Sequence, residues 1–396
     1  MEVFIFDWLA YGENVDKFKV NGKVPKLGRK HFSPQVAMDT YEEHLTSWVE
    51  AERLGFDGIA LNEHHATPYG LMNSPNLLAA SLAQRTERVK ILIYANLLPI
   101  HDPLRLAEEL AMLDCLSKGR LIAGVGRGAP REYNIFNVPM AESRSRFEES
   151  YEVIRRAWTE ESFSFEGKHY NYKDVSIWPR PVQDPHPKVW VPVTSSKETI
   201  EWAAANNIGI TPGVLPGSVR EDTLRYYAQC QAQYGRKVKP EDLNIMVDCY
   251  VADSKAKAVE EYAPYLMYFF NTLLLYDHVK QQNIQKGYYS TTSFKHLREG
   301  KKGTLAEDAT VFHEWDIDAV RGFVEQMPIG PADEVVDKII AEADEAGAQN
   351  ILLVCNRGGM PQEMFLNQVR RIGQEVLPRL QKHKVTRVKF AEEAVA

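Results

Sequence analysis

Short apolar runs alternate with longer amphipathic segments along almost the whole chain. Several runs are apolar at consecutive positions, as in Ile351-Leu352-Leu353-Val354, and strands that are covered on both faces have this character. The pattern predicts eight strands, at Val3–Leu9, Asp57–Leu61, Val89–Leu98, Arg120–Gly126, Lys188–Thr194, Asn207–Thr211, Asn244–Ala252 and Gln349–Cys355.

The segments between these strands have the periodicity and the boundary residues of helices. Thr40–Leu54 carries its apolar residues on one stripe. Asp102 is an N-cap followed by proline at the first helical position, and that helix extends to Leu116. A helix over Pro331–Ala346 ends at Gly347. Eight strands alternating with helices favour an α/β fold, a parallel (β/α)8 TIM barrel, over a doubly wound open sheet, which usually has fewer strands.

Two stretches interrupt the alternation, one after the fourth strand and one after the seventh. Ser162–Val182 alternates aromatic and polar residues and predicts a β-hairpin. Tyr262–Trp315 is too long for a simple connection, so we interpret it as an insertion with an aromatic helical part and a polar loop. Glycines around Tyr288–Gly303 leave open whether this loop closes over a site. We expect one domain over residues 1–396, with the insertion at about 262–315.

Composition restricts the classes of function. The hydrophobic content of 44% and the charged content of 26% are typical of a soluble globular protein. The formal charge of −7 argues against nucleic-acid binding, which needs a basic surface. No signal peptide and no apolar run of about 18 residues is visible, so we expect a cytoplasmic protein that does not enter a membrane. The cysteines have no CxxC spacing and are expected to be reduced thiols: Cys115, Cys230, Cys249 and Cys355.

A histidine pair directly follows the second predicted strand. In a barrel of this kind the C-terminal ends of the strands build the active site, and a histidine there can act as an acid, a base or a charge stabiliser. His64 is the candidate, and a hydrogen-bonded structural histidine is the alternative. Adjacent residues on extended backbone point to opposite sides, so His64 and His65 are not expected to chelate one ion, and we predict no metal site.

Two further strand ends carry groups that suit an anion. Gly126-Arg127-Gly128 lets the backbone approach a flat ligand while Arg127 reaches an anion, or it is a tight turn with a solvated arginine. Thr194-Ser195-Ser196 leads into a helix, with Ser196 as its N-cap and Thr199 one turn further on. Free N–H groups, the helix dipole and these hydroxyls suit a phosphate, although plain capping also accounts for Ser196.

The third strand and the insertion carry weaker signals. Tyr94 and Ala95 lie where a barrel interior opens, and they suit either a wall under a planar ring or ordinary core layering. The aromatic run Tyr265–Tyr276 suits an apolar substrate pocket, a core or a dimer surface.

In combination, these motifs resemble the bacterial luciferase-like flavin monooxygenases. The resemblance covers about Met1–Gly213 and resumes at Ile329-Gly330-Pro331 through the last strand and helix. It rests on segments that are specific together and not singly: Asn62-Glu63-His64-His65, Leu98-Pro99, Asp102-Pro103, Leu116-Ser117-Lys118-Gly119-Arg120, Gly126-Arg127-Gly128, Ser195-Ser196 and Thr199-Ile200-Glu201-Trp202-Ala203.

The resemblance implies an FMN site at the strand C-termini. His64 would be the catalytic histidine beside the flavin, and Gly126 would lie close to the isoalloxazine. Tyr94-Ala95 would form the non-proline cis peptide of the family. The phosphate would be held by Arg127, Ser195, Ser196 and Thr199, with Thr194 also in the cofactor site.

The activity implied is that of a two-component monooxygenase. Reduced FMN from a separate NAD(P)H:flavin reductase would react with O₂ through a C4a-(hydro)peroxyflavin and oxygenate a small hydrophobic or aromatic substrate. The family also implies a homodimer. Ser195 stands where the luciferase α subunit has a glutamate, and Gly126 where it has a reactive cysteine, which speaks against light emission from long-chain aldehydes. F420-dependent hydride transfer and flavin binding without turnover are the alternatives.

Overall fold

The barrel is seen in a computed structural model that describes residues 1–396 except 12–28, 129, 194–195, 214–216, 272–314 and 391–396. Its strands are β1 (Glu2–Asp7), β2 (Gly58–Leu61), β3 (Lys90–Leu97), β4 (Leu121–Gly126), β7 (Lys188–Val193), β8 (Gly209–Pro212), β9 (Asn244–Asp248) and β12 (Asn350–Val354).

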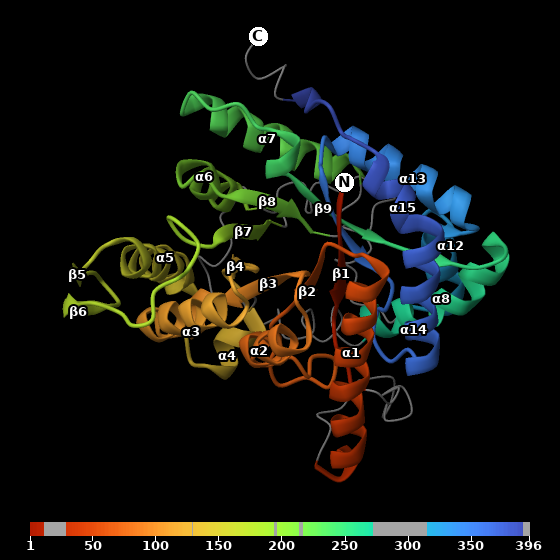
Figure 1. Cartoon of the computed structure of the whole chain (residues 1–396), viewed down its shortest axis with the longest axis horizontal. Coiled ribbons are helices and arrows are strands. Elements are labelled where there is room, and N and C mark those ends of the chain that lie inside the picture. The colour runs from red at the N-terminus through yellow and green to blue at the C-terminus, as the bar shows by residue number, and fades with distance from the viewer. Residues whose placement is uncertain (12–28, 129, 194–195, 214–216, 272–314, 391–396) are drawn as a thin grey trace.

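These eight strands are parallel and follow the order β8-β7-β4-β3-β2-β1-β12-β9 (Figure 1). The two ends of this order meet through a parallel bridge between Ile210 and Leu243, so the sheet curls into a nearly closed barrel. The predicted (β/α)8 barrel is confirmed, and the alternative of an open doubly wound sheet is excluded.

Helices surround the strands. They are α1 (Pro34–Leu54), α2 (Pro75–Arg85), α3 (Pro103–Leu116), α4 (Pro130–Ile135), α5 (Ser143–Thr159), α6 (Lys197–Ala205), α7 (Gly217–Gln233), α8 (Lys255–Phe269), α12 (Ile317–Val324), α13 (Ala332–Ala346), α14 (Gln362–Arg371) and α15 (Leu377–Lys382). Within the described ranges, none of them combines the length and the apolar character that a bilayer crossing requires.

Capping residues set the helix ends. The Asp102 carboxylate accepts the Arg105 N–H at 3.0 Å and starts α3, and Gly347 ends α13 at a φ of 66°, both as predicted. The predicted start of the first helix at Thr40 is wrong, because α1 begins at Pro34 after an N-cap at Ser33. The first turn of α1 is mostly exposed and adds little to the apolar stripe on which the prediction relied.

The predicted strand Asn244–Ala252 is two strands. β9 ends at Asp248, the Cys249 N–H then bonds to Val354 O at 2.9 Å, and β10 (Tyr250–Val251) leaves the barrel. β10 pairs with β11 (Ile329–Gly330) in a separate two-stranded sheet. Both parts are buried, so the apolar run continues across the break and hydropathy alone cannot locate it.

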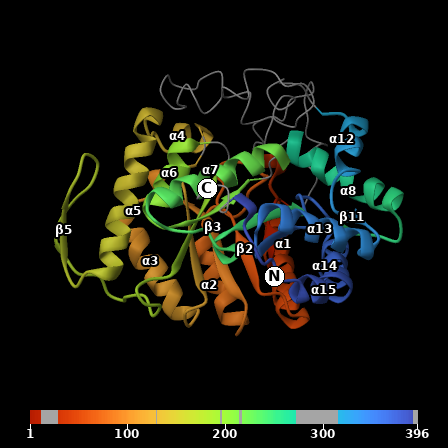
Figure 2. The same cartoon turned by 90° about the horizontal axis from the view of Figure 1, so that it is seen from above.

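The two interruptions lie where they were expected, after the fourth and the seventh barrel strand. β5 (Phe163–Glu166) and β6 (Asn171–Val175) form the predicted antiparallel hairpin, which stands away from the barrel beside α5 (Figure 2). In the second, α8 extends to Phe269. Residues 272–314, with the Tyr288–Gly303 loop and the end of the Tyr265–Tyr276 run, lie outside the described residues.

Alternate residues of the barrel strands fill its interior. They form one buried cluster of Phe4, Phe6, Ala60, Leu92, Tyr94, Ile122, Trp190, Met246, Leu352 and Val354, whereas residues of the opposite parity, such as Val3 and Ile5, pack under the helices. At Gly124 on β4, a Cβ would lie 1.9 Å from the carbonyl oxygen of Ile93 on β3. The close packing of β3 on β4 therefore requires glycine at this position.

We predict opposite effects for two glycine-to-alanine substitutions. Gly124→Ala forces the main chains of β3 and β4 apart and should lower the free energy of unfolding by about 3 kcal/mol or more. Gly322→Ala lies in α12, where a Cβ meets no atom within 4 Å, and should raise it by about 0.5–1 kcal/mol. Urea titration compares the two, and equal midpoints would contradict the role of Gly124.

Candidate active site

The predicted site residues that the structure describes lie at one rim of the barrel. His64 follows β2, Arg127 follows β4, and Ser196 caps the helix that follows β7. Because all eight barrel strands are parallel, their C-terminal ends face the same side. Thr194 and Ser195 belong to the segments outside the described residues.

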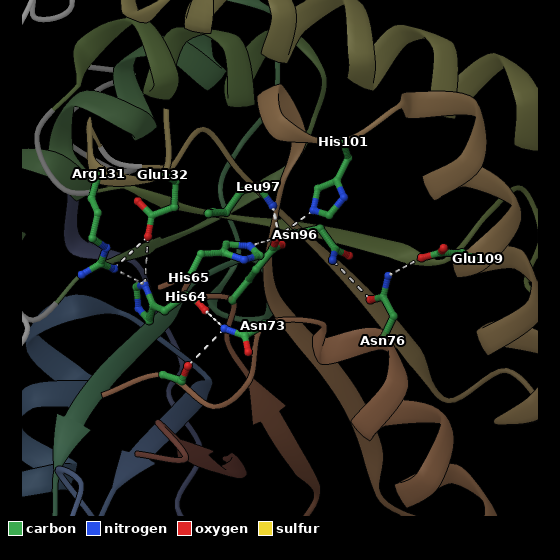
Figure 3. A network of polar contacts seen from close by, with 12 residues as sticks. His64, His65, Asn73, Asn76, Asn96, Leu97, His101, Glu109, Arg131 and Glu132 are labelled. Atoms are coloured by element: carbon green, nitrogen blue, oxygen red, sulfur yellow. Dashed lines mark hydrogen bonds and ion pairs between the residues drawn. The ribbon is translucent and has the colours of Figure 1, made fainter. Parts of the chain in front are cut away.

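His64 is held by a buried ion pair from α4. Arg131 Nη2 donates to Glu132 Oε1 at 2.8 Å and lies 3.3 Å from His64 Nδ1 (Figure 3). Glu132 Oε1 is 3.6 Å from the same ring nitrogen. The indole of Trp8 stacks on the imidazole, with ring centroids 5.7 Å apart and planes 14° apart. The imidazole is thereby fixed by contacts from two other segments of the chain, α4 and the residue that follows β1.

The charge of Glu132 is stabilised by these partners. Burial alone would raise its pKa, but the contact with His64 and the positive charge of Arg131 outweigh burial and lower the pKa to about 2. Glu132 is thus an anion at any pH at which the protein works. The anion lies 3.6 Å from His64 Nδ1, so a carboxylate and a guanidinium both face the same ring nitrogen.

A second buried carboxylate, Glu63, joins the strand ends of β2 and β3. Its Oε1 accepts from His65 Nε2 at 2.7 Å and from His101 Nε2 at 2.8 Å, and its Oε2 accepts the Leu97 N–H at 2.9 Å (Figure 3). The hydrogen bonds from His101 and His65 outweigh burial and lower the pKa of Glu63 to about 2. Glu63 therefore fixes the main chain that precedes His64 and the strand that carries Tyr94.

Tyr94 and Ala95 are joined by a cis peptide bond, the form that the family resemblance implied. Both are buried near the end of β3. On the neighbouring strand, a Cβ at Gly126 would lie 3.2 Å from Ala95 Cβ and 3.4 Å from Leu97 Cδ2. The absence of a side chain at Gly126 keeps this part of the rim open to a flat group.

Hydroxyls and guanidinium groups meet at the N-terminus of α6. Ser196 Oγ accepts the Thr199 N–H at 3.3 Å as the predicted cap, and Arg144 Nη2 on α5 donates to Ser196 Oγ and to Thr199 Oγ1, each at 2.9 Å. Arg144 Nη1 is buried and has no hydrogen-bond partner. Burial and the nearby charge of Arg127 lower the pKa of Arg144.

These groups form an anion pocket, by which we mean Arg127, Arg144, Ser196 and Thr199. Two guanidinium groups, of which Arg127 disfavours the charge of Arg144, together with a helix N-terminus, attract an anion such as a phosphate. Glu198 accepts from Ser196 Oγ at 3.0 Å, so one carboxylate offsets part of this positive charge. The unpaired Nη1 of Arg144 supplies a donor that the pocket itself does not use.

The sequence analysis missed several of these residues. Arg144 is one of four arginines on α5, and nothing in its spacing distinguishes it from Arg146, Arg155 or Arg156. Arg131 and Glu132 follow the glycine loop closely, so their position near a strand end was a usable signal. Glu63 and Trp8 were also adjacent to predicted strand ends. Among the described residues, no group of three or more His, Cys, Asp or Glu side chains is arranged to hold a metal ion.

Comparison with known sequences points to one family. A family model described as luciferase-like monooxygenase matches residues 25–350. Protein y4wF of Sinorhizobium fredii, which is uncharacterized, is 35% identical over 203 residues, or 49% of this chain and 59% of that protein. The alkanal monooxygenase alpha chain of Photorhabdus luminescens is 26% identical over 83% of this chain and 88% of its own length. The oxygenase component of the flavin-dependent trigonelline monooxygenase of Acinetobacter baylyi is 27% identical over 89% of this chain and 93% of its own length.

Solved structures share the fold. Monooxygenase RslO1 from Streptomyces bottropensis has a TM-score of 0.70 and 27% identity, with 96% of this chain and 99% of that chain covered. The oxygenating constituent of 3,6-diketocamphane monooxygenase of Pseudomonas putida, in complex with FMN, has a TM-score of 0.72 at 19% identity and coverages of 96% and 98%. An F420-dependent secondary alcohol dehydrogenase has a TM-score of 0.65 and 15% identity, with 96% of this chain and 98% of that chain covered. The last two similarities concern the fold alone.

The Glu63–His101 pair should make stability depend on pH. The hydrogen bond and charge of Glu63 outweigh burial and raise the pKa of His101 above 6.5, so this pair stabilises the fold fully below pH 6.5 and loses its effect as the pH rises through the raised pKa. On the acid side, the contribution of Glu63 is present above pH 4.5 and is lost as the pH falls towards about 2. His101→Gln should therefore flatten the decrease of the melting temperature above pH 6.5.

The matched control for this prediction is His383→Gln. It removes a histidine–carboxylate contact of the same 2.8 Å length, but its carboxylate, Asp344, is half exposed, whereas Glu63 is buried. Thermal unfolding followed by circular dichroism should leave the pH profile of the control unchanged. A wild-type profile in His101→Gln would contradict the predicted linkage.

Proposed function

The chain belongs to the luciferase-like monooxygenase family, and from this premise we propose that it is the FMN-dependent oxygenase of a two-component system. It would use reduced FMN and O₂ to oxygenate a small organic substrate that is hydrophobic or aromatic. The single observation that carries the proposal is the anion pocket on the same rim as His64. A phosphate in that pocket and a ring beside Gly126 and Ala95 would bring the flavin next to the imidazole.

The residues present fit FMN. A phosphate dianion would take up the unused Nη1 donor of Arg144 and relieve the mutual repulsion of Arg144 and Arg127. The Thr199 hydroxyl, which accepts from Arg144, would add a donor, and the Ser196 hydroxyl would add a second one by leaving Glu198. A side chain at Gly126 would occupy the space against Ala95 into which the edge of a flat ring fits. Thr194 and Ser195 are proposed from the sequence to complete the cofactor site.

Bound FMN supplies the reduction and transfer of oxygen, and the protein supplies its setting. Arg127, Arg144 and the start of α6 would hold the phosphate and so orient the ring. Arg131 donates towards His64 Nδ1, so in the neutral imidazole Nδ1 is the acceptor and Nε2 carries the proton. A neutral His64 would therefore donate a hydrogen bond from Nε2, and it would give up that proton only after the ring has gained another one, as an imidazolium that Glu132 would stabilise. We assign the proton-transfer role to His64 on this geometry.

The proposed partners follow from the same assignment. The relative from Acinetobacter baylyi is named as an oxygenase component, which supports a separate NAD(P)H:flavin reductase here as well. A homodimer in the cytoplasm is also proposed. The dimer is supported by large exposed apolar side chains on three successive helices, namely Met38 on α1, Leu77 on α2 and Met112 on α3.

Removal of Arg144 should weaken the binding of the phosphate and not of the ring. We expect Arg144→Ala to raise the dissociation constant for FMN by about tenfold to a hundredfold, the effect of one charge-assisted hydrogen bond, with riboflavin affinity unchanged. Arg146→Ala is the control, because Arg146 lies on the same helix and pairs with Glu142. Flavin fluorescence titration measures the six constants, for FMN and riboflavin with the wild type and the two variants. Equal losses for FMN and riboflavin in Arg144→Ala would contradict the phosphate assignment.

The reaction itself is tested with reduced FMN and O₂. Protein saturated with reduced FMN should delay both the return of oxidised-flavin absorbance and the appearance of hydrogen peroxide relative to free reduced FMN. His64→Ala should bind FMN normally and change the rate of peroxide release by about tenfold to a hundredfold, the range of positioned proton transfer. Stopped-flow absorbance with a peroxide assay measures this. Tight binding of F420 with no oxygen consumption would replace the proposal by hydride transfer.

A further inference from the structure

Two neighbouring side chains at the rim, Trp8 and Arg357, each carry a buried hydrogen-bond donor that has no acceptor. Trp8 follows β1, and its Nε1 is buried without a hydrogen-bond partner; Arg357 follows β12, is fully buried, and its Nη1 is likewise unpaired. The Arg357 guanidinium lies 5.8 Å from the centre of the Trp8 ring. A buried donor without an acceptor costs about 1–3 kcal/mol, so two of them on neighbouring side chains are unusual unless a ligand completes them.

The rest of Arg357 is fully engaged, which fixes the unpaired arm in place. Its Nε and Nη2 donate to Asp248 Oδ1 and Oδ2 at 2.7 and 2.6 Å, a bidentate pair buried at the end of β9. The Tyr69 hydroxyl donates to the carbonyl oxygen of Arg357. The aromatic ring of Phe269 lies 4.7 Å from the guanidinium. Only Nη1 is left to bind a further group.

The surroundings of the two donors are aromatic. Trp8 packs against Phe269 and Tyr69 with ring centroids 5.2 and 5.8 Å apart, and these two rings are 5.6 Å from each other. Aromatic walls with a few placed polar groups are typical of small-molecule sites. The same Trp8 ring stacks on His64, so a molecule bound by the donors would lie one ring away from the imidazole.

The donors lie on the side of the rim away from the anion pocket. In the barrel order the anion pocket is built where β4 meets β7, whereas Trp8 and Arg357 follow β1 and β12, with β3 and β2 in between. His64, at the end of β2, stands between the two. A flavin anchored by its phosphate in the anion pocket would therefore leave the Trp8–Arg357 side for a second molecule.

We infer that Trp8 Nε1 and Arg357 Nη1 bind an acceptor oxygen of the substrate, and that the substrate is a neutral aromatic or alicyclic compound with a carbonyl-type oxygen. The inference rests on the proposed oxygenase function and names the class of its substrate. Neutrality follows from charge, because Asp248 already balances Arg357 and the site has no net positive charge to offer a carboxylate. A hydrocarbon of the same shape is rejected, because it would leave both donors buried and unpaired.

The test uses matched probes and does not require turnover. Calorimetry on the FMN-loaded protein compares acetophenone with ethylbenzene, benzaldehyde with styrene, and cyclohexanone with methylenecyclohexane, with benzoate as the anionic probe. At least one carbonyl member should bind about tenfold more tightly than its hydrocarbon partner. Equal affinities in every pair, no binding of any carbonyl member, or tightest binding of benzoate would overturn the inference.

Trp8→Phe keeps the ring and removes only the N–H. It should reduce the carbonyl preference, since Arg357 Nη1 remains as the second donor, while FMN affinity stays unchanged. Trp190→Phe is the matched control, because Trp190 Nε1 is also buried and unpaired but lies inside the barrel on β7. An equal effect of both substitutions would count against the site. A carbonyl preference without oxygen consumption would support the substrate site and refute the oxygenase function. Oxygenase activity without a carbonyl preference would support the oxygenase function and refute the substrate site.

Discussion

Hydrogen bonding between eight parallel strands, closed by the bridge from Ile210 to Leu243, is the constraint on which the other features depend. Parallel pairing places every strand C-terminus on one rim, so groups far apart in the chain become neighbours. Trp8 and Arg357 are separated by almost the whole sequence, yet they are in contact because β1 pairs with β12. The close approach of β3 to β4, which Gly124 permits, is part of the same closure.

Buried carboxylates then organise the rim. Glu63 and Glu132 each lie against histidine, Asp248 holds Arg357, and Asp7 accepts from Trp48 Nε1 at 2.9 Å. Each pair joins two or more segments, so the loss of one partner leaves a charge buried and unpaired, which costs about 3–5 kcal/mol. This arrangement gives the loops that carry His64 and Arg357 the rigidity of the barrel. A site built in this way holds its side chains in place before a ligand arrives.

The rim is divided into two chemically different halves. The side near β4 and β7 offers positive charge and hydroxyls. The side near β1 and β12 offers aromatic surface and two donors without net charge, the indole of Trp8 and the Arg357 guanidinium that Asp248 neutralises. His64 lies between them and contacts both α4 and Trp8. One scaffold can serve different reactions when the first half is retained for the cofactor and the second half varies.

The sequence by itself determined the strand and helix pattern, the (β/α)8 class, the hairpin, and the positions of His64, Arg127, Ser196 and Thr199 at strand ends. These depend on periodicity, capping and the rule that parallel strands share a rim, all of which are local signals. The break after Asp248 and the true start of α1 needed the structure, because burial on both sides of a break conceals it. Only tertiary packing decided the roles of Arg144 and Glu132 and the contact between Trp8 and Arg357. For Arg144 the reason is that the rotation of its helix against the barrel selects which arginine faces the pocket, and no spacing along the chain encodes that angle.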